Sequence, residues 1–130
     1  MSFLHPYSSL LLSVLRFMSG LLVLQHGTTK ILAFPVTQHT GTPIASMSGA
    51  AGVIELVCGI LVTVGLFTRP AAFLLSGMTA VAYFLAHASR NFFPILNGGE
   101  LAALYCFVFL YLAAAGGGSI SLDRMLRGKD

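Results

Sequence analysis

The chain has 130 residues, of which 56% are apolar and only 8% are charged, with a formal net charge of +3. A soluble domain carries roughly 25% charged residues, and a small one exposes much of its surface to water. This composition therefore argues against a soluble enzyme, and the mean hydropathy of +0.87 argues against a disordered chain. The small, dispersed positive charge does not indicate nucleic-acid binding. We expect a single integral membrane domain that covers residues 1–130.

Four apolar runs are candidates for membrane-spanning segments: 8–26, 49–67, 70–88 and 99–115. Each approaches the length of about 20 residues that a spanning helix needs. The runs are continuous rather than alternating, and in lipid a continuous apolar run satisfies its backbone groups as a helix. The sequence therefore predicts an all-α fold, an integral membrane four-helix bundle.

Local residues predict where these helices begin and end. Pro70 suits the first turn of the third helix, where its missing N–H matters little. Asn97 and Glu100 have the spacing of a capping box before the fourth helix, and Gly116 is expected to end that helix. The second and third runs are separated by a few residues and predict a tight hairpin. Residues 27–48 predict a long irregular connection.

The charges outside the spans predict the orientation of the chain. Four spans place both termini and the short second connection on one side of the membrane. That side holds Arg69, Arg124, Arg127 and Lys129, and the opposite side holds Lys30 and Arg90. The positive-inside rule then places both termini in the cytoplasm. The apolar linker 90–98 is expected to contact membrane lipid at the interface.

Ionisable groups inside a membrane usually face the interior of a helix bundle because lipid does not solvate them. The rise per residue places six polar side chains toward one half of the bilayer. These side chains belong to His26, Lys30, Glu55, His87, Asn97 and Glu100. Arg16 lies deeper, about 12 Å above the other end of its helix, and its side chain is long enough to approach Glu55. We expect all seven to form a polar pocket below one membrane surface.

Each of these residues also has a purely structural interpretation. Arg16 and Glu55 could be an ion pair that sets the register of two helices, since each charge alone is costly in lipid. Glu100 could simply cap its helix.

The histidines have similar alternatives. His26 and Lys30, four residues apart, could share a helix face at the level of the lipid headgroups. His87 could be satisfied by the hydroxyl of Tyr83, one turn earlier. Because no two histidines have close helical spacing, we expect no metal site.

Small residues on the second span indicate a close-packed face. Gly52 and Gly59 are seven residues apart, and Glu55 follows Gly52 by three residues on much the same face. We therefore expect Glu55 to point into the bundle. Cys58 and Cys106 both fall inside spans and are interpreted as small packing residues, with a redox role left open.

The ordered set of motifs resembles the DoxX family of membrane proteins over nearly the whole chain. The matching strings are Arg16…Gly20…His26-Gly27-x-x-Lys30, Gly52-x-x-Glu55-x-x-x-Gly59, Gly65-Leu66-x-Thr68-Arg69-x-Ala71-Ala72, Tyr83-Phe84-x-x-His87, Asn97-x-Gly99-Glu100 and Ser121-Leu122-Asp123. The resemblance implies a small four-helix protein of the bacterial inner membrane. Its relatives include a subunit of thiosulfate:quinone oxidoreductase and proteins linked to oxidative stress and thiol handling.

The resemblance and the expected pocket together suggest a component of a quinone-linked redox system or of an oxidative-stress and thiol system. The protein would be an oxidoreductase subunit rather than an enzyme acting alone. The pocket would bind a quinone headgroup or a small sulfur anion. No flavin, haem or iron–sulfur motif is present, so electron transfer would need a bound quinone or a partner enzyme. One alternative is a non-enzymatic scaffold for a redox enzyme. Another is a small-solute carrier, which would require a homo-oligomer.

Overall fold

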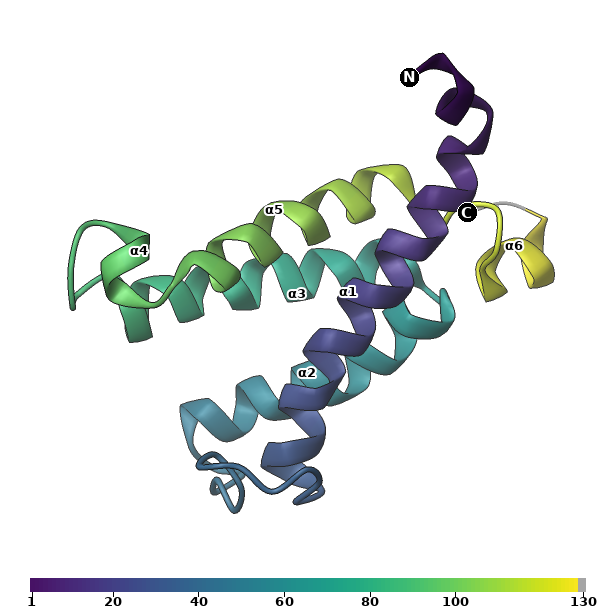
Figure 1. Cartoon of the computed structure of the whole chain (residues 1–130). Helices are drawn as coiled ribbons and strands as arrows, with labels where there is room; N and C mark the ends of the chain where they lie inside the picture. The colour runs from purple at the N-terminus through teal and green to yellow at the C-terminus, as the bar shows by residue number, and fades with distance from the viewer. Residues whose placement is uncertain (129–130) are drawn as a thin grey trace.

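A computed structural model describes residues 1–128, and every regular element in this part of the chain is helical (Figure 1). The elements are a 3₁₀ helix η1 (Ser2–Tyr7), α1 (Ser8–Ile31), α2 (Met47–Val64), α3 (Thr68–Ala82), a π-helical turn η2 (Tyr83–His87), α4 (Pro94–Asn97), α5 (Glu100–Ala115) and α6 (Leu122–Arg127). The predicted all-α class is therefore confirmed. Lys129, used above in counting charges, lies outside the described residues.

Three helical stretches are long and apolar enough to cross a membrane: Ser2–Leu32, Met47–Val64 and Thr68–His87. Helix α5 is also apolar but has only 16 residues. At 1.5 Å per residue it spans about 24 Å, less than the hydrocarbon thickness of about 30 Å. Among its described residues the chain thus has three helices that are long and apolar enough to cross a membrane.

Helices α1 and α2 pack closely because glycines remove the side chains between them. A Cβ atom at Gly20 would lie 2.7 Å from the backbone nitrogen of Thr63, and one at Gly59 would lie 2.9 Å from Cα of Leu24. The predicted close-packed face of the second span is therefore correct. Glu55 lies on it and is 7% exposed, so its expected inward orientation is confirmed.

A second helix pair, α3 and α5, lies beside the first, and the two pairs are joined by the α2–α3 hairpin (Figure 1). The hairpin turns at Gly65, whose φ of +78° suits glycine. Leu75, Phe109 and Leu112 are fully buried in the core. The hydroxyl of Ser76 on α3 donates to the carbonyl oxygen of Cys106 on α5 at 2.7 Å.

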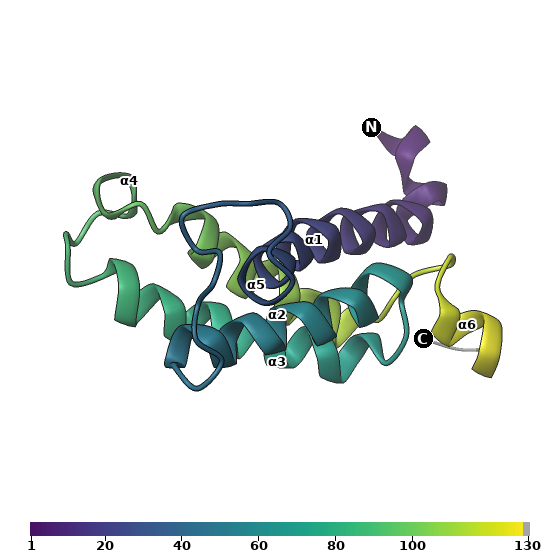
Figure 2. The same ribbon diagram turned by 90° about the horizontal axis from the view of Figure 1, so that it is seen from below.

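The two ends of the molecule differ. Figure 2 shows the 32–46 loop and α4 toward one end, and the N-terminus with α6 toward the other. Helix α6 follows the glycines after α5, which ends at Ala115 as Gly116 predicted. We call the end that holds the 32–46 loop and α4 the loop end, and the end that holds the N-terminus and α6 the tail end.

The helix boundaries differ from the predicted spans, most clearly in three places. Helix α1 continues to Ile31, so Lys30 is helical and the irregular connection is only 32–46. Helix α2 ends at Val64 because Gly65 adopts a left-handed conformation. The third helix changes from α to π geometry at Tyr83.

Candidate functional site

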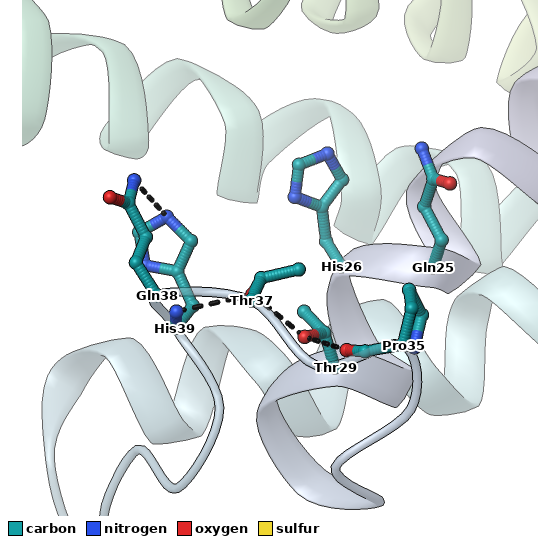
Figure 3. Close-up of a pocket in the computed structure, with 7 residues that line it drawn as sticks. All are labelled: Gln25, His26, Thr29, Pro35, Thr37, Gln38 and His39. Atoms are coloured by element: carbon teal, nitrogen blue, oxygen red, sulfur yellow. Dashed lines mark hydrogen bonds between the residues drawn. The ribbon is translucent and has the colours of Figure 1, made fainter.

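A polar hollow lies at the loop end, between the last turns of α1 and the 32–46 loop (Figure 3). Its volume is about 470 Å³, and none of its seven lining residues is acidic. They are Gln25, His26, Thr29, Pro35, Thr37, Gln38 and His39. Helix α1 supplies the first three and the loop supplies the rest, so the hollow depends on how the loop folds back onto the helix.

The hydroxyl of Thr29 holds the loop against α1 through hydrogen bonds. Its side chain is buried, and its hydroxyl donates to the carbonyl oxygen of Pro35. The same oxygen lies 2.8 Å from Oγ1 of Thr37 and 3.2 Å from Oγ1 of Thr40. Since a hydroxyl has one hydrogen and two lone pairs, Thr29 donates once and accepts from both threonines. One buried hydroxyl therefore connects three residues of the loop to α1.

Two imidazoles and two amides supply the polar groups of the hollow. Gln25 and His26 are on α1, whereas Gln38 and His39 are on the loop, as Figure 3 shows. Nε2 of Gln38 lies 3.4 Å from Nε2 of His39. These side chains offer hydrogen-bond donors and acceptors for a polar ligand.

A buried ion pair lies one helical turn beyond His26. Nζ of Lys30 on α1 is 2.8 Å from Oε1 of Glu55 on α2, and their side chains are 12% and 9% exposed. Gly52 makes room for the Lys30 stem, because a Cβ atom at Gly52 would lie 3.1 Å from Cβ and Cδ of Lys30. The pair connects the two helices directly below the loop end.

The predicted contact of Arg16 with Glu55 is wrong. The Arg16 guanidinium instead donates to the carbonyl oxygens of Gly117 and Ile120, at 2.5 and 2.7 Å. Arg16 and Lys30 are 14 residues apart on one helix, a separation of about 21 Å. Because α1 packs in a register that places Lys30 beside Glu55, Arg16 lies at the tail end.

Arg16 belongs to a polar junction that holds the tail against the helices. Asp123 is the second anchor of this junction: its carboxylate accepts from the backbone N–H groups of Phe67 and Thr68, at 2.8 and 3.0 Å, at the start of α3. Burial acts to raise the pKa of the Asp123 carboxyl, but the N–H groups and the nearby Arg127 outweigh this effect and lower its pKa. The tail thereby caps α3.

His87 and Asn97 meet at the other side of the loop end. Nδ1 of His87 lies 3.1 Å from the backbone carbonyl oxygen of Asn97, so the alternative in which the Tyr83 hydroxyl satisfies His87 is wrong. The Tyr83 hydroxyl accepts from the Asn97 amide. The expected capping box is also absent, because Asn97 ends α4 and Gly99 precedes α5. Glu100 is an exposed residue in the first turn of α5.

Comparison with known proteins decides the family. The DoxX family model matches residues 11–88. This chain belongs to the DoxX family. An uncharacterized protein of Haemophilus influenzae is 44% identical over 128 residues, which cover 95% of this chain and 96% of that protein. A second uncharacterized protein of Haemophilus influenzae is 32% identical over 73 residues, 56% of this chain and 48% of that protein. No solved structure matches the chain significantly.

In this DoxX protein the seven predicted site residues fall into separate groups. The structure pairs Lys30 with Glu55 and His87 with Asn97, places His26 in the hollow, and leaves Arg16 at the tail end. No hydrogen bond or ion pair within residues 1–128 joins the first two groups. The hollow and the Lys30–Glu55 pair lie within the matched residues 11–88.

Sequence reasoning missed most of the hollow of this DoxX protein. The missed lining residues are Gln25, Thr29, Pro35, Thr37, Gln38 and His39. The polar run 37–42 within an otherwise apolar chain was the available signal. It could not be placed, because hydropathy and helical periodicity do not determine where an irregular loop folds.

Proposed function

We propose that this DoxX protein is a component of a quinone-linked redox system of the bacterial inner membrane, and that the hollow binds the quinone headgroup. The observation that carries the proposal is the pair of imidazoles, His26 and His39, across a hollow of about 470 Å³ beside the membrane-spanning part of α1. A quinone has two carbonyl acceptors on an apolar ring. N–H groups of imidazoles and amides are matching donors.

The lining residues fit such a group in three respects. They contribute no carboxylate that would repel a carbonyl oxygen. They come from a helix end and a loop, so an apolar quinone tail could remain in lipid while the head is held. The Lys30–Glu55 pair, one turn away, stiffens the helix pair that carries the site. When bound, the quinone would accept or deliver electrons and protons, while this chain binds and orients it and a partner enzyme exchanges the electrons.

The proposal includes a single four-span domain with α5 as the fourth crossing. The loop 32–46 and α4 would then lie on the periplasmic side of the membrane, and both termini would be cytoplasmic. The tail end holds Arg69, Arg124 and Arg127, and the loop end holds Lys30 and Arg90. This excess of positive charge at the tail end supports the orientation.

Quinone binding to purified protein tests the proposal. We expect a short-chain quinone such as decylubiquinone to raise the melting temperature of the detergent-solubilised protein in a saturable manner. His26→Ala should weaken binding by about tenfold, as expected for one lost hydrogen bond to a ligand. His5→Ala is the matched control, since His5 lies in η1 at the tail end and should leave the affinity unchanged.

Three outcomes would contradict the proposal. One is the absence of a saturable response to quinone, and another is equal weakening by His26→Ala and His5→Ala. The third is a stoichiometric enzyme partner that copurifies with the protein and is retained in both variants without any quinone response. That result would favour the scaffold function. Solute flux through a homo-oligomer in liposomes, again without quinone binding, would favour the carrier function.

A further inference from the structure

A second polar cluster lies where α3 ends. The helix widens into the π-helical turn η2, in which the N–H of Ala88 donates to the carbonyl oxygen of Tyr83 at 2.9 Å. Such turns are rare and are frequently found at functional sites. The turn presents Tyr83 and His87 on one side, with ring centroids 6.4 Å apart.

Asn97 fixes the hydrogen-bond roles in this cluster. It is 1% exposed, and its Oδ1 accepts from the backbone N–H of Gly99 at 2.7 Å. Nδ2 donates to the carbonyl oxygen of Asn91 at 3.0 Å and to Oη of Tyr83 at 3.2 Å. The N–H of Gly99 can only donate and the carbonyl oxygen of Asn91 can only accept, so the oxygen and nitrogen of the amide cannot be exchanged. The Tyr83 oxygen is therefore an acceptor toward Asn97, and its own hydrogen remains available to donate.

The carbonyl of Asn97 likewise fixes the tautomer of His87. A carbonyl oxygen can only accept, so the hydrogen lies on Nδ1, which is 3.1 Å away. In the neutral ring Nε2 then carries a lone pair. Nε2 bonds to no residue within 1–128 and is not among the buried atoms that lack a partner. It is thus an accessible acceptor at the loop end.

The surroundings of the two groups are aromatic. The ring of Phe84 stands edge-on to Tyr83 with centroids 5.5 Å apart and is 70% exposed. A ligand here would meet one hydrogen-bond donor, one acceptor and the exposed ring of Phe84.

We infer that Tyr83 and His87 form a binding site for a hydroxyl group, separate from the hollow. The Tyr83 hydroxyl donates to the oxygen of the ligand, and Nε2 of His87 accepts the hydrogen of the same group. A hydroxyl offers both functions on one small group, and the exposed ring of Phe84 favours an aromatic alcohol such as a phenol. A lipid headgroup with free hydroxyls, such as phosphatidylglycerol, carries the same chemistry. None of the residues that line the hollow takes part, so the inference does not depend on the proposed function.

Nitrogen NMR of the histidines tests the inference. The chain has four histidines, which can be labelled together with ¹⁵N in the full-length protein in micelles. We expect His87 to be the Nδ1–H tautomer, and 4-methoxyphenol to shift its Nε2 resonance in a saturable manner. The ether 1,4-dimethoxybenzene has the same ring without a hydroxyl and should not produce this shift. An Nε2–H tautomer, or equal shifts from both compounds, would overturn the inference.

Two further arms identify the residues and the source of the hydroxyl. Tyr83→Phe should weaken binding of 4-methoxyphenol at least about fivefold, as for one lost hydrogen bond. Tyr111→Phe, at an exposed position of α5, should not. Unchanged His26 and His39 resonances would show that Tyr83→Phe is folded, and unchanged binding in that variant would overturn the site.

The lipid arm replaces phosphatidylcholine in the micelles with phosphatidylglycerol. If lipid supplies the hydroxyl, this replacement should shift the Nε2 resonance of His87 without any phenol. If neither 4-methoxyphenol nor phosphatidylglycerol shifts the His87 resonance, the site is refuted.

Discussion

Lys30 and Glu55 are charged side chains in apolar helices, and each is the partner of the other. Lys30 and Glu55 are both nearly buried and lie 2.8 Å apart on neighbouring helices. Removing one partner of a buried pair leaves an uncompensated charge, whereas replacing both can be nearly neutral. The pair is therefore expected to be strongly coupled in stability, independently of any ligand.

Glu55→Gln should destabilise the protein by about 3 kcal/mol, because the Lys30 ammonium would lose its counter-charge in a buried position. The measurement is thermal or denaturant unfolding in detergent. The double variant Lys30→Met with Glu55→Gln should recover most of this loss. Equal stability of the single variant and the wild type would show that the two charges are not coupled in solution.

At the scale of helices, the α1–α2 pair is set by backbone contacts at small residues. A Cβ atom at Gly59 would meet the backbone of Leu24, whereas one at Gly77 on α3 would have no neighbouring atom from another part of the chain within 4 Å. The two glycines therefore differ in their surroundings although both lie in apolar helices. This difference separates the effect of close packing from the effect of helix propensity.

Gly59→Ala should destabilise the protein by about 1 to 3 kcal/mol, because the added methyl group would lie 2.9 Å from Cα of Leu24 and force the helices apart. Unfolding in detergent measures the change. Gly77→Ala is the matched control and should be neutral or stabilising by up to about 1 kcal/mol, since alanine favours a helix. Similar losses in both variants would argue that helix propensity, and not the α1–α2 contact, explains the effect.

At the scale of the whole molecule, the tail end is a structural junction and the loop end carries the accessible polar groups. Arg16 and Asp123 hold the tail end together through backbone partners. The hollow and the Tyr83–His87 cluster lie at the loop end. A ligand is therefore expected to approach from the side of the membrane that the loop end faces.

Cysteine labelling tests the proposed topology with α5 as a fourth crossing. In a chain without Cys58 and Cys106, a cysteine at Ala45 or Asn91 should react with a membrane-impermeant maleimide in intact spheroplasts. A cysteine at Ser119 should react only after the membrane is permeabilised, because α5 returns the chain to the cytoplasm. Labelling of Ser119→Cys in intact spheroplasts would contradict either the fourth crossing or the orientation.

The sequence by itself determined the helical class, the membrane environment and the inward face of Glu55. Continuous apolar runs form helices in lipid because the backbone must satisfy itself, and this requirement is local. The glycines at positions 52 and 59 were sufficient to identify the packed face, because a seven-residue spacing returns to the same side of a helix. These features need no knowledge of neighbouring helices.

Only the tertiary structure decided which partners the polar residues have. Arg16 and Lys30 were both candidates for Glu55, and the axial register of α1 against α2, set by close contacts at Gly20 and Gly59, selects Lys30. The hollow depends on a loop held by Thr29, which no periodicity reveals. Pairing across helices depends on long-range geometry, because side chains far apart in the sequence meet only when the helices are packed.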